Sequence, residues 1–444
     1  MEERYVAAIE ISSSKIIGAV GRVLPSGQIN IIAVEQEKCL ESVRYGIIQN
    51  LEETALRVAR IIEKIERSPS IAPKKIRSVF VGLSGRSLHS IPTTVKINLP
   101  DDTEVTDSII ERLRSDALRV AIDNTLEIVD AVPRKYHIGK LETLTPKGAI
   151  GNEIEADFDI IVCRPELKRN IQRVIQDKLG IGIAGFVVTA LATGHLILSP
   201  EEKRLGCMLT DIGAETTIVT LYRNGSLNYF ATLPFGGRNI TRDITSLSLL
   251  EERAEDIKKT SGNAIAPENP SSLNLNGIKL SDVANLVVAR SEEIVANIAE
   301  QISYAGIKEK DLPGGIICIG GGTRLNGMTE LLTRQIGLPA KYGRLPAYVH
   351  IEGVKGAGAE ISEVASILYA GATLTRTECL EVPKREEIPV TGEKPEKQDE
   401  PADNANETPR GPSAMGKFGK LVRDKISRIF ANPEDDDDSS LLEQ

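Results

Sequence analysis

The sequence predicts an α/β fold with two lobes, built from two related halves, with an inserted α+β domain and a polar C-terminal segment. Two observations lead to this prediction. A strand-turn-strand plan near the N-terminus recurs after residue 206, and alternating strand and helix patterns continue to about residue 380, where apolar side chains give way to prolines and mixed charges. With 444 residues, 41% of them hydrophobic, the chain can form several domain-sized units.

The internal repeat has the same order of elements in both copies. The first copy reads as a strand at 7–9, a turn at 10–15, a returning strand at 16–20, a second turn at 25–27 and a third strand at 28–34. The second copy reads as a strand at 208–210, a turn at 211–217, and strands at 218–221 and 226–233. Both turns open with an acidic residue and continue with small residues. Duplication of this kind implies two halves that face one another.

The repeat and the composition divide the chain into segments. We expect a first lobe at 1–78 and 164–203, an inserted α+β domain at 79–163, a second lobe at 204–226 and 310–380, an insertion of the second lobe at 227–309, a disordered linker at 381–414, an amphipathic helix at 415–430 and an acidic tail at 431–444. Within the insertions we expect a strand at 76–84, a helix at 106–122, a strand at 157–163 and helices near 240–305.

Composition excludes several function classes. A net charge of −9, the absence of Trp and 4% aromatic residues argue against a nucleic-acid binder. The five cysteines are scattered and are expected to be reduced and mostly buried, and the four dispersed histidines give no metal-ligand spacing. The first residues lack the zones of a signal peptide, and no apolar run reaches the ~20 residues of a spanning helix, so we expect a cytoplasmic protein.

The two acidic turns contain the groups that bind a nucleotide's phosphates and Mg²⁺. Ser12, Ser13 and Ser14 offer hydroxyls and amides, and Lys15 offers a positive charge. Asp211 is a candidate to hold Mg²⁺ through water, because this cation prefers carboxylate and water oxygens. Taken alone, each turn is more often an ordinary hairpin.

Two further elements strengthen the nucleotide hypothesis. An apolar strand pattern at 316–319 ends at the triple glycine 320–322, where backbone can approach a flat ligand and the following helix, from about 327 to 336, can expose N–H groups. In a helix expected at 250–260, Glu255 and Lys258 share one face, although a solvated ion pair is the commoner explanation of such a pair.

In order and spacing, these motifs resemble the actin/Hsp70 ATPase superfamily. Within it, the insertion at 79–163, the motif Leu233-Pro234-Phe235-Gly236-Gly237, the polar linker and the terminal helix are similar to those of the FtsA family of bacterial cell-division proteins. The resemblance implies an actin-like fold of duplicated ribonuclease-H-like domains that binds ATP with Mg²⁺. The nucleotide-binding residues it implies are Ser12, Ser13, Ser14, Lys15, Asp211, Gly213, Ala214, Thr216, Thr217, Gly236, Gly237, Glu255, Lys258, Gly320, Gly321, Gly322 and Arg324.

The chain departs from the family pattern at two places. Ser12 stands where the family usually has glycine, which is expected to weaken or reshape phosphate binding. The segment that supplies a water-orienting Glu or Gln in ATP-hydrolysing relatives reads Phe186 to His195, within a helix expected at 186–199, and contains neither residue. Hydrolysis is therefore expected to be slow at most, with no catalytic residue assigned.

The C-terminal pattern predicts a membrane-binding helix, whatever the family. Apolar side chains fall on one side and basic side chains on the other, with a net charge of +4 when Asp424 is counted. Each basic residue contributes roughly 1 kcal/mol near an anionic leaflet. The lesser alternative is that the helix docks back on the protein. The candidate membrane-binding residues are Lys417, Phe418, Lys420, Leu421, Val422, Arg423, Lys425, Ile426, Arg428, Ile429 and Phe430.

The resemblance implies a polymerising adaptor that links FtsZ, the tubulin-like division protein, to the cytoplasmic face of the inner membrane at the septum. Its implied partners are the FtsZ C-terminal tail, docking near 227–309 around the helix at 290–302, further copies of itself, later division proteins and anionic lipids, with no nucleic acid. One alternative is a PilM-like pilus-assembly adaptor, which is not expected to end in a tethered amphipathic helix. A small-molecule kinase would need a carboxylate base at 186–199, and a chaperone would need a substrate domain after residue 380.

Overall fold

The computed structural model describes residues 3–39, 41–266, 274–275, 278–352, 361–374 and 376–383. The predicted membrane-binding residues 417–430, the acidic tail and all but the first residues of the predicted linker lie outside this range. Among the described residues, none of the helices combines the length and the hydropathy that a membrane span requires.

A six-stranded sheet forms the first lobe, in the order β12-β7-β1-β2-β3-β20. Strands β1 and β2 form an antiparallel hairpin, whereas β7 runs parallel to β1. Most side chains of β1 and β2 are buried, because helices cover the sheet. The bounds are β1 (Arg4–Ile11), β2 (Lys15–Val23), β3 (Ile29–Lys38), β7 (Ser78–Leu83), β12 (Gly182–Val188) and β20 (Val349–Ile351).

Helix α1 (Leu51–Arg67) shows why the first-lobe helices form where they do. The Asn50 side chain caps its N-terminus by accepting a hydrogen bond from the Glu53 amide. Val58, Ile61, Ile62 and Ile65 recur at helical spacing and face the core. The other helices here are α3 (Pro165–Gln172), continued by a π-helix at Arg173–Lys178, α4 (Thr189–Ile197) and α10 (Ser362–Leu374). Helix α5 (Pro200–Leu205) packs instead on β14 (Thr217–Arg223) of the second lobe.

The second lobe repeats the strand order of the first. Antiparallel β13-β14-β15 corresponds to β1-β2-β3, and β18 runs parallel to β13 as β7 does to β1. The predicted duplication is therefore confirmed. The bounds are β13 (Cys207–Ile212), β14 (Thr217–Arg223), β15 (Ser226–Leu233), β18 (Ile316–Ile319), β19 (Ala340–Tyr342), α6 (Gly237–Thr245), α7 (Glu251–Ser261), α8 (Leu280–Tyr304) and α9 (Met328–Ile336), with 3-10 turns at Glu309–Asp311 and Gly321–Arg324.

The inserted domain is an antiparallel sheet with one covering helix and its own apolar core around Phe158. Its sheet continues that of the second lobe, since His89 of β8 pairs with Ala231 of β15. The bounds are β8 (His89–Glu104), α2 (Asp107–Ala117), β9 (Glu127–Ile138), β10 (Leu141–Thr143) and β11 (Ile150–Cys163). The short pairs are β4 (Val43–Arg44) with β5 (Ile47–Ile48), β6 (Lys75–Ile76) with β21 (Leu380–Glu381), and β16 (Asn274–Leu275) with β17 (Ile278–Lys279).

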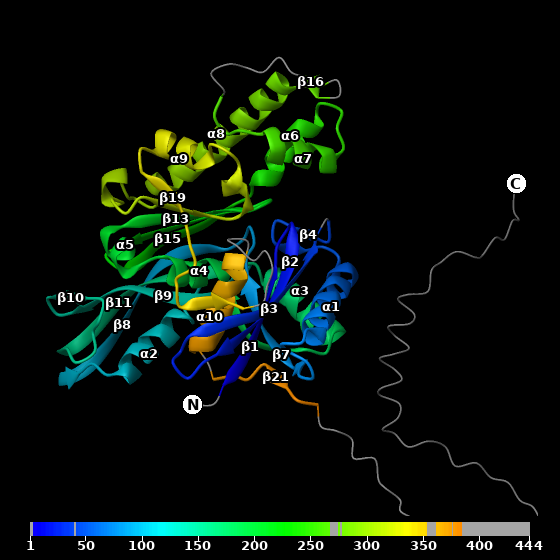
Figure 1. Cartoon of the computed structure of the whole chain (residues 1–444). Helices are drawn as coiled ribbons and strands as arrows, with labels where there is room; N and C mark the ends of the chain where they lie inside the picture. The colour runs from blue at the N-terminus through cyan, green and yellow to red at the C-terminus, as the bar shows by residue number, and fades with distance from the viewer. Residues whose placement is uncertain are drawn as a thin grey trace, which may run out of the picture. The chain divides into compact units, whose positions relative to one another are not determined.

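Three expected boundaries differ from the structure. The insertion expected at 79–163 begins after Leu83, because β7 pairs with β1 and β12 of the first lobe. The insertion expected at 227–309 begins after Leu233, where β15 ends. Strand β20 and helix α10, both in the range assigned to the second lobe, belong to the first: β20 pairs with β3, and α10, orange in Figure 1, packs on β1, β2 and α4.

All five cysteines are buried and unpaired with one another, as the sequence predicts. Burial raises the pKa of Cys163, Cys207 and Cys318 to about 12 in each case, with nearby carboxylates contributing at the first two. These thiols are packing residues and not nucleophiles.

Candidate functional site

The first predicted phosphate turn lies between β1 and β2 and is held mainly by serine groups. The Ser12 amide and hydroxyl both donate to the Lys15 carbonyl, at 3.0 and 2.8 Å. Ser13 is 5% exposed, and its hydroxyl accepts a hydrogen bond from the Gly46 amide at 2.9 Å. Ser14 is exposed at the tip of the turn. The Ser12 side chain therefore folds back into its own turn.

The second predicted phosphate turn lies between β13 and β14 and is held by backbone. The Gly213 amide donates to the Thr216 carbonyl at 2.9 Å. The carbonyls of Gly213 and Ala214 accept hydrogen bonds from the Gly237 and Arg238 amides at the start of α6, at 2.9 and 2.7 Å. A Cβ atom on Gly236 would lie 2.5 Å from the Gly213 carbonyl oxygen, so glycine is required at this contact.

The triple glycine packs directly on the second turn. Gly320 has φ +86°, and a Cβ atom there would lie 2.3 Å from an Asp211 carboxylate oxygen. A Cβ atom on Gly237 would be 3.5 Å from the Gly322 Cα. Gly321 differs, because nothing lies within 4 Å of the position of its Cβ. The structure thus joins 211–217, 236–237 and 320–322 into one backbone surface, open at Gly321.

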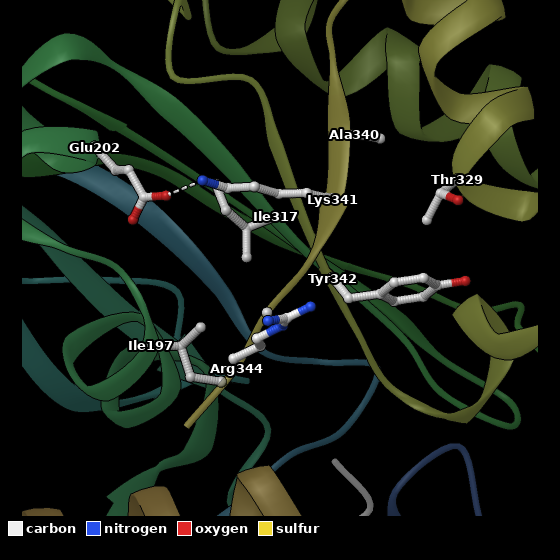
Figure 2. A pocket seen from close by; sticks show the side chains of 9 residues that line it. Ile197, Glu202, Ile317, Thr329, Ala340, Lys341, Tyr342 and Arg344 are labelled. Carbon is white, nitrogen blue, oxygen red and sulfur yellow. Dashed lines mark ion pairs between the residues drawn. The ribbon is translucent and has the colours of Figure 1, made fainter. Parts of the chain in front are cut away.

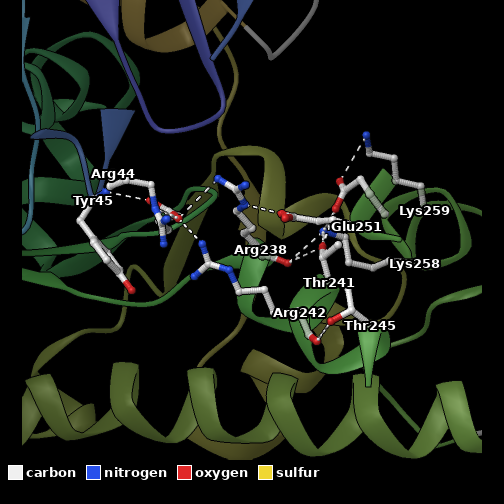
Figure 3. Close-up of polar contacts among 12 residues, drawn as sticks. Arg44, Tyr45, Arg238, Thr241, Arg242, Thr245, Glu251, Lys258 and Lys259 are labelled. Carbon is white, nitrogen blue, oxygen red and sulfur yellow. Dashed lines mark hydrogen bonds and ion pairs between the residues drawn. The ribbon is translucent and has the colours of Figure 1, made fainter. Parts of the chain in front are cut away.

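The Glu255–Lys258 pair is half-buried, with the side chains 33% and 12% exposed, and is therefore not the fully solvated pair that is the commoner explanation of such a pattern. The Lys258 ammonium lies 2.6 Å from the Glu255 carboxylate and donates to the Gly237 carbonyl at 2.9 Å. Burial lowers the pKa of Lys258. In Glu255 burial raises the carboxyl pKa, but the Lys258 charge and the hydrogen bonds from Lys258 and Thr241 together lower it below the ordinary value. Figure 3 shows Lys258 beside Thr241 of α6. The pair is therefore attached to the second phosphate turn through α6.

Three carboxylates gather where the lobes meet: Glu10 at the end of β1, Asp211 at the end of β13, and Glu363 in the first turn of α10. Burial and then the Glu363 charge raise the pKa of Glu10 and of Asp211 well above the ordinary values, against the opposing charge of Lys15. Burial also raises the pKa of Glu363, which Lys15 and Arg324 oppose. Glu10 is 6% exposed, and its Oε2 atom has no hydrogen-bond partner among the described residues.

This donor set fits Mg²⁺. Three carboxylates against Lys15 and Arg324 leave an excess of negative charge, and the buried Glu10 oxygen without a partner among the described residues needs a cation or a water molecule. Mg²⁺ keeps several of its waters in protein sites, so the carboxylates can act through water and need not all contact the ion.

Sequence reasoning missed Glu363 and the hairpin that contacts both phosphate turns. Glu363 resembles an ordinary acidic residue at a helix start, and only the return of α10 to the first lobe brings it to Glu10. The β4–β5 hairpin reaches the first turn through Gly46 and the second through Tyr45. Tyr45 and Gly46, with φ 51° and 75°, form the two-residue turn, and Tyr-Gly is not a common sequence for it.

The segment expected to be a helix from 186 divides into two elements. Residues 186–188 end β12, and α4 begins at Thr189 because parallel pairing with β7 extends to Val188. Ala190 and Thr193 of α4 line a small cavity together with Asp211. No carboxylate or glutamine occurs in α4.

A larger cavity, about 550 Å³, opens beside edge strand β19 and contains none of the predicted nucleotide-binding residues. Ile197, Ile317 and Ala340 form its apolar part, and the Lys341–Glu202 ion pair, at 2.6 Å, crosses it (Figure 2). In the inserted domain, one potential ligand atom each of His137, Glu155 and Asp157 lies within 4.8 Å of the others on neighbouring strands, a grouping that the dispersed histidines of the sequence did not predict. There His137 contacts Asp157 at 3.1 Å.

Two lobes of one topology, with a glycine-lined turn in the second and three carboxylates between them, define an actin-like fold. A solved structure described as "PilM-PilN type IV pilus biogenesis complex" has the same fold, with a TM-score of 0.58 and 18% identity over 83% of this chain and 98% of that chain.

Family comparisons go further than the fold. The model for "Cell division protein FtsA" matches residues 208–355, and that for the "SHS2 domain inserted in FTSA" matches residues 85–162. The cell division protein FtsA of Porphyromonas gingivalis is 31% identical over 347 residues, which cover 76% of this chain and 72% of that protein. FtsA of Bacillus subtilis is 29% identical over 343 residues, covering 74% and 76%. The chain belongs to the FtsA family of cell-division proteins.

Proposed function

We propose that the cleft between the lobes binds ATP with Mg²⁺, and that bound nucleotide controls assembly of the protein into filaments. The observation that carries the proposal is the group Glu10, Asp211 and Glu363 around Lys15, with a buried Glu10 oxygen that has no partner among the described residues. Burying three carboxylates costs free energy unless a cation neutralises part of their charge. Its place between two phosphate turns is where a Mg²⁺-bound triphosphate fits.

Each predicted residue then has a physical role. The two phosphate turns, 12–15 and 213–217, would lie on either side of the phosphates, with the exposed Ser14 at the tip of the first, and Lys15 would neutralise part of their charge. Mg²⁺, held through water by Asp211 with Glu10 and Glu363 nearby, would neutralise more of that charge. The open surface at Gly321 receives the flat base, beside Arg324. Glu255 and Lys258, already fixed to α6, contact ribose and adenine.

Binding of a fluorescent ATP analogue with Mg²⁺ tests this assignment. Wild-type protein should bind, whereas Asp211→Ala and Gly321→Arg should bind much less, because the first removes a cation ligand and the second fills the open surface. Asp107→Ala removes an exposed carboxylate of α2 and is the control. Equal binding by all four proteins would overturn the assignment.

We also propose that ATP hydrolysis is slow. Helix α4 carries no group that orients the attacking water, and the carboxylates of the cleft are placed to hold a cation. Turnover should stay below ~1 per second, the low end of ordinary enzymes. A clearly faster rate in purified protein would contradict this proposal.

Family membership and the C-terminal pattern support a wider role. We propose that the protein tethers FtsZ filaments to the cytoplasmic face of the inner membrane at the division septum and helps to recruit later division proteins. The FtsZ tail would dock around α8, and residues 415–430 would bind anionic lipids. The PilM-like alternative shares the fold only, at 18% identity, whereas the relatives at 26–31% identity are FtsA proteins.

A further inference from the structure

The Glu215 carboxylate, in the middle of the second phosphate turn, is completely buried and is bound by both lobes. From the first lobe, the Arg44 guanidinium and the Tyr45 amide each donate to it at 2.8 Å. From the second lobe, Arg242 donates at 2.6 Å, and Arg238 lies 3.5 Å away. Figure 3 shows the three arginines pointing towards one another from the two lobes. The predicted nucleotide contacts give this carboxylate no role.

The hairpin that supplies Arg44 and Tyr45 also holds the first phosphate turn. Its two-residue tip, Tyr45-Gly46, directs one amide to Glu215 and the next amide to the Ser13 hydroxyl. The tip has little freedom to move, since a Cβ atom on Gly46 would lie 2.5 Å from the Ser84 carbonyl oxygen. One short rigid element therefore contacts both phosphate turns.

Tyr45 adopts φ 51°, an uncommon conformation for a bulky residue. The Arg86 guanidinium lies 5.2 Å from the centroid of the Tyr45 ring, and the Arg86 amide donates to the Tyr45 carbonyl at 3.1 Å. Strained residues persist where their surroundings fix them, and they cluster at functional sites. The strain at Tyr45 is what directs two successive amides to the two turns.

We propose that Glu215 is a positioning residue of the nucleotide site: its carboxylate holds the β4–β5 tip against the second phosphate turn and so fixes the spacing of the two turns. The proposal rests on the proposed nucleotide binding. Because a nucleotide between the turns is enclosed by this connection, its release requires the Glu215 contacts with Arg44 and Tyr45 to break. Glu215 thus sets how long ATP stays bound.

Two variants test the proposal in the full chain. Glu215→Gln keeps the size of the side chain and removes its charge, and Arg44→Ala removes the first-lobe arginine. Arg134→Ala is the matched control: its side chain is 32% exposed and pairs with Asp159, 1% exposed, whereas Arg44 is 33% exposed and pairs with Glu215, 0% exposed. Arg134 lies in the inserted domain, away from the phosphate turns.

The first measurement is the release rate of a fluorescent ATP analogue, chased with unlabelled ATP. Glu215→Gln and Arg44→Ala should release it at least about tenfold faster, and Arg134→Ala within about twofold of wild type, because a charged pair at a binding site acts mainly on the dissociation rate. If both variants fold and release the analogue at the same rate as Arg134→Ala, the proposal is overturned. If Glu215→Gln fails to fold, Arg44→Ala decides.

The second measurement needs no nucleotide. Hydrogen exchange of the first turn, residues 12–15, should be about tenfold faster in Glu215→Gln and Arg44→Ala, because a loosened β4–β5 tip weakens the hydrogen bond between the Gly46 amide and the Ser13 hydroxyl. It should be unchanged in Arg134→Ala. Unchanged exchange in both variants would overturn the proposal. If wild-type protein binds no ATP, the proposed function fails, and this measurement alone decides whether Glu215 fixes the spacing of the turns.

Discussion

The two phosphate turns occupy equivalent places in the duplicated lobes but are held in different ways. The first turn is fixed by serine hydroxyls and by the β4–β5 hairpin, which belongs to another part of its lobe. The second is fixed by close backbone contacts with α6 and with Gly320 and Gly322, where the space for a Cβ atom is missing, and by the buried Glu215 carboxylate, which both lobes bind. The duplicated lobes therefore share the position of the turns but not the contacts that hold them. The second turn should therefore tolerate change far less than the first.

The largest effect should come from Gly320→Ala. The substitution forces a Cβ atom against Asp211 and Ile212 at a residue with φ +86°, so we expect a loss of about 2–5 kcal/mol in the free energy of unfolding, combining strain and overpacking. Urea unfolding measures it. Gly321→Ala, where no atom lies within 4 Å of the new Cβ, is the matched control and should stay within about 1 kcal/mol of wild type. Equal losses would refute the distinction.

A smaller effect concerns the carboxylates between the lobes. Because the pKa of Glu10 is raised in the folded protein, its ionised form opposes folding, and stability should rise as the pH falls towards the ordinary value of 4.5. Without Mg²⁺ at pH 8, Glu10→Gln should thus be more stable than wild type, because the variant has no ionised group to bury. The gain should shrink towards pH 5 and in the presence of Mg²⁺. Thermal unfolding at pH 5 and pH 8, with EDTA or with Mg²⁺, measures this gain in stability. A gain that is the same at both pH values and with or without Mg²⁺ would argue against a cation site at Glu10.

Ser12→Ala should have a modest effect, because the hydroxyl makes one hydrogen bond within its own turn. We expect a loss of about 0.5–1.5 kcal/mol in stability, with ATP affinity changed by less than about threefold. Urea unfolding and titration with fluorescent ATP measure the two quantities. A large loss of ATP affinity would show that the Ser12 hydroxyl faces the phosphates. The two turns would then differ less than their contacts indicate.

The smallest effect on the nucleotide should come from removing the inserted domain. Replacing residues 89–162 by a short Gly/Ser bridge removes a unit with its own core, joined to the second lobe where His89 pairs with Ala231, and keeps Arg86, which contacts Tyr45. ATP binding should be unchanged, whereas filaments or recruitment of later division proteins should change. Loss of ATP binding by a folded deletion would mean that the insertion supports the cleft.

The repeated elements were predictable because their signals are local. Apolar runs that end in small polar turns predict β1–β2 and β13–β14. The glycines 320–322 predict a place where another group approaches the backbone closely. The sequence could not predict that Glu255 and Lys258 are half-buried, because an ion pair at positions i and i+3 of a helix has the same sequence pattern in solvent as in a core.

The contacts that were missed depend on the path of the chain. Glu363 reaches Glu10 because α10 returns to the first lobe after the second lobe is complete, and no periodicity records such a return. Likewise Glu215 is an unremarkable acidic residue of a turn until the β4–β5 tip places Arg44 and Tyr45 on it. Sequence patterns specify which elements form, whereas the crossings between lobes decide which charged groups meet.

We propose that nucleotide bound between the lobes controls attachment to a membrane through residues 415–430. One amphipathic helix should bind weakly, whereas a filament presents many helices to one surface and can raise avidity by ~10² to 10⁴. Co-sedimentation of the full chain, and of a chain truncated after Ala414, with anionic liposomes, with and without Mg²⁺-ATP and FtsZ, tests this proposal. We expect ATP to increase pelleting of the full chain, high salt to weaken it, and the truncated chain to stay soluble. Pelleting of the truncated chain at the wild-type level would show that residues 415–430 are not the membrane anchor.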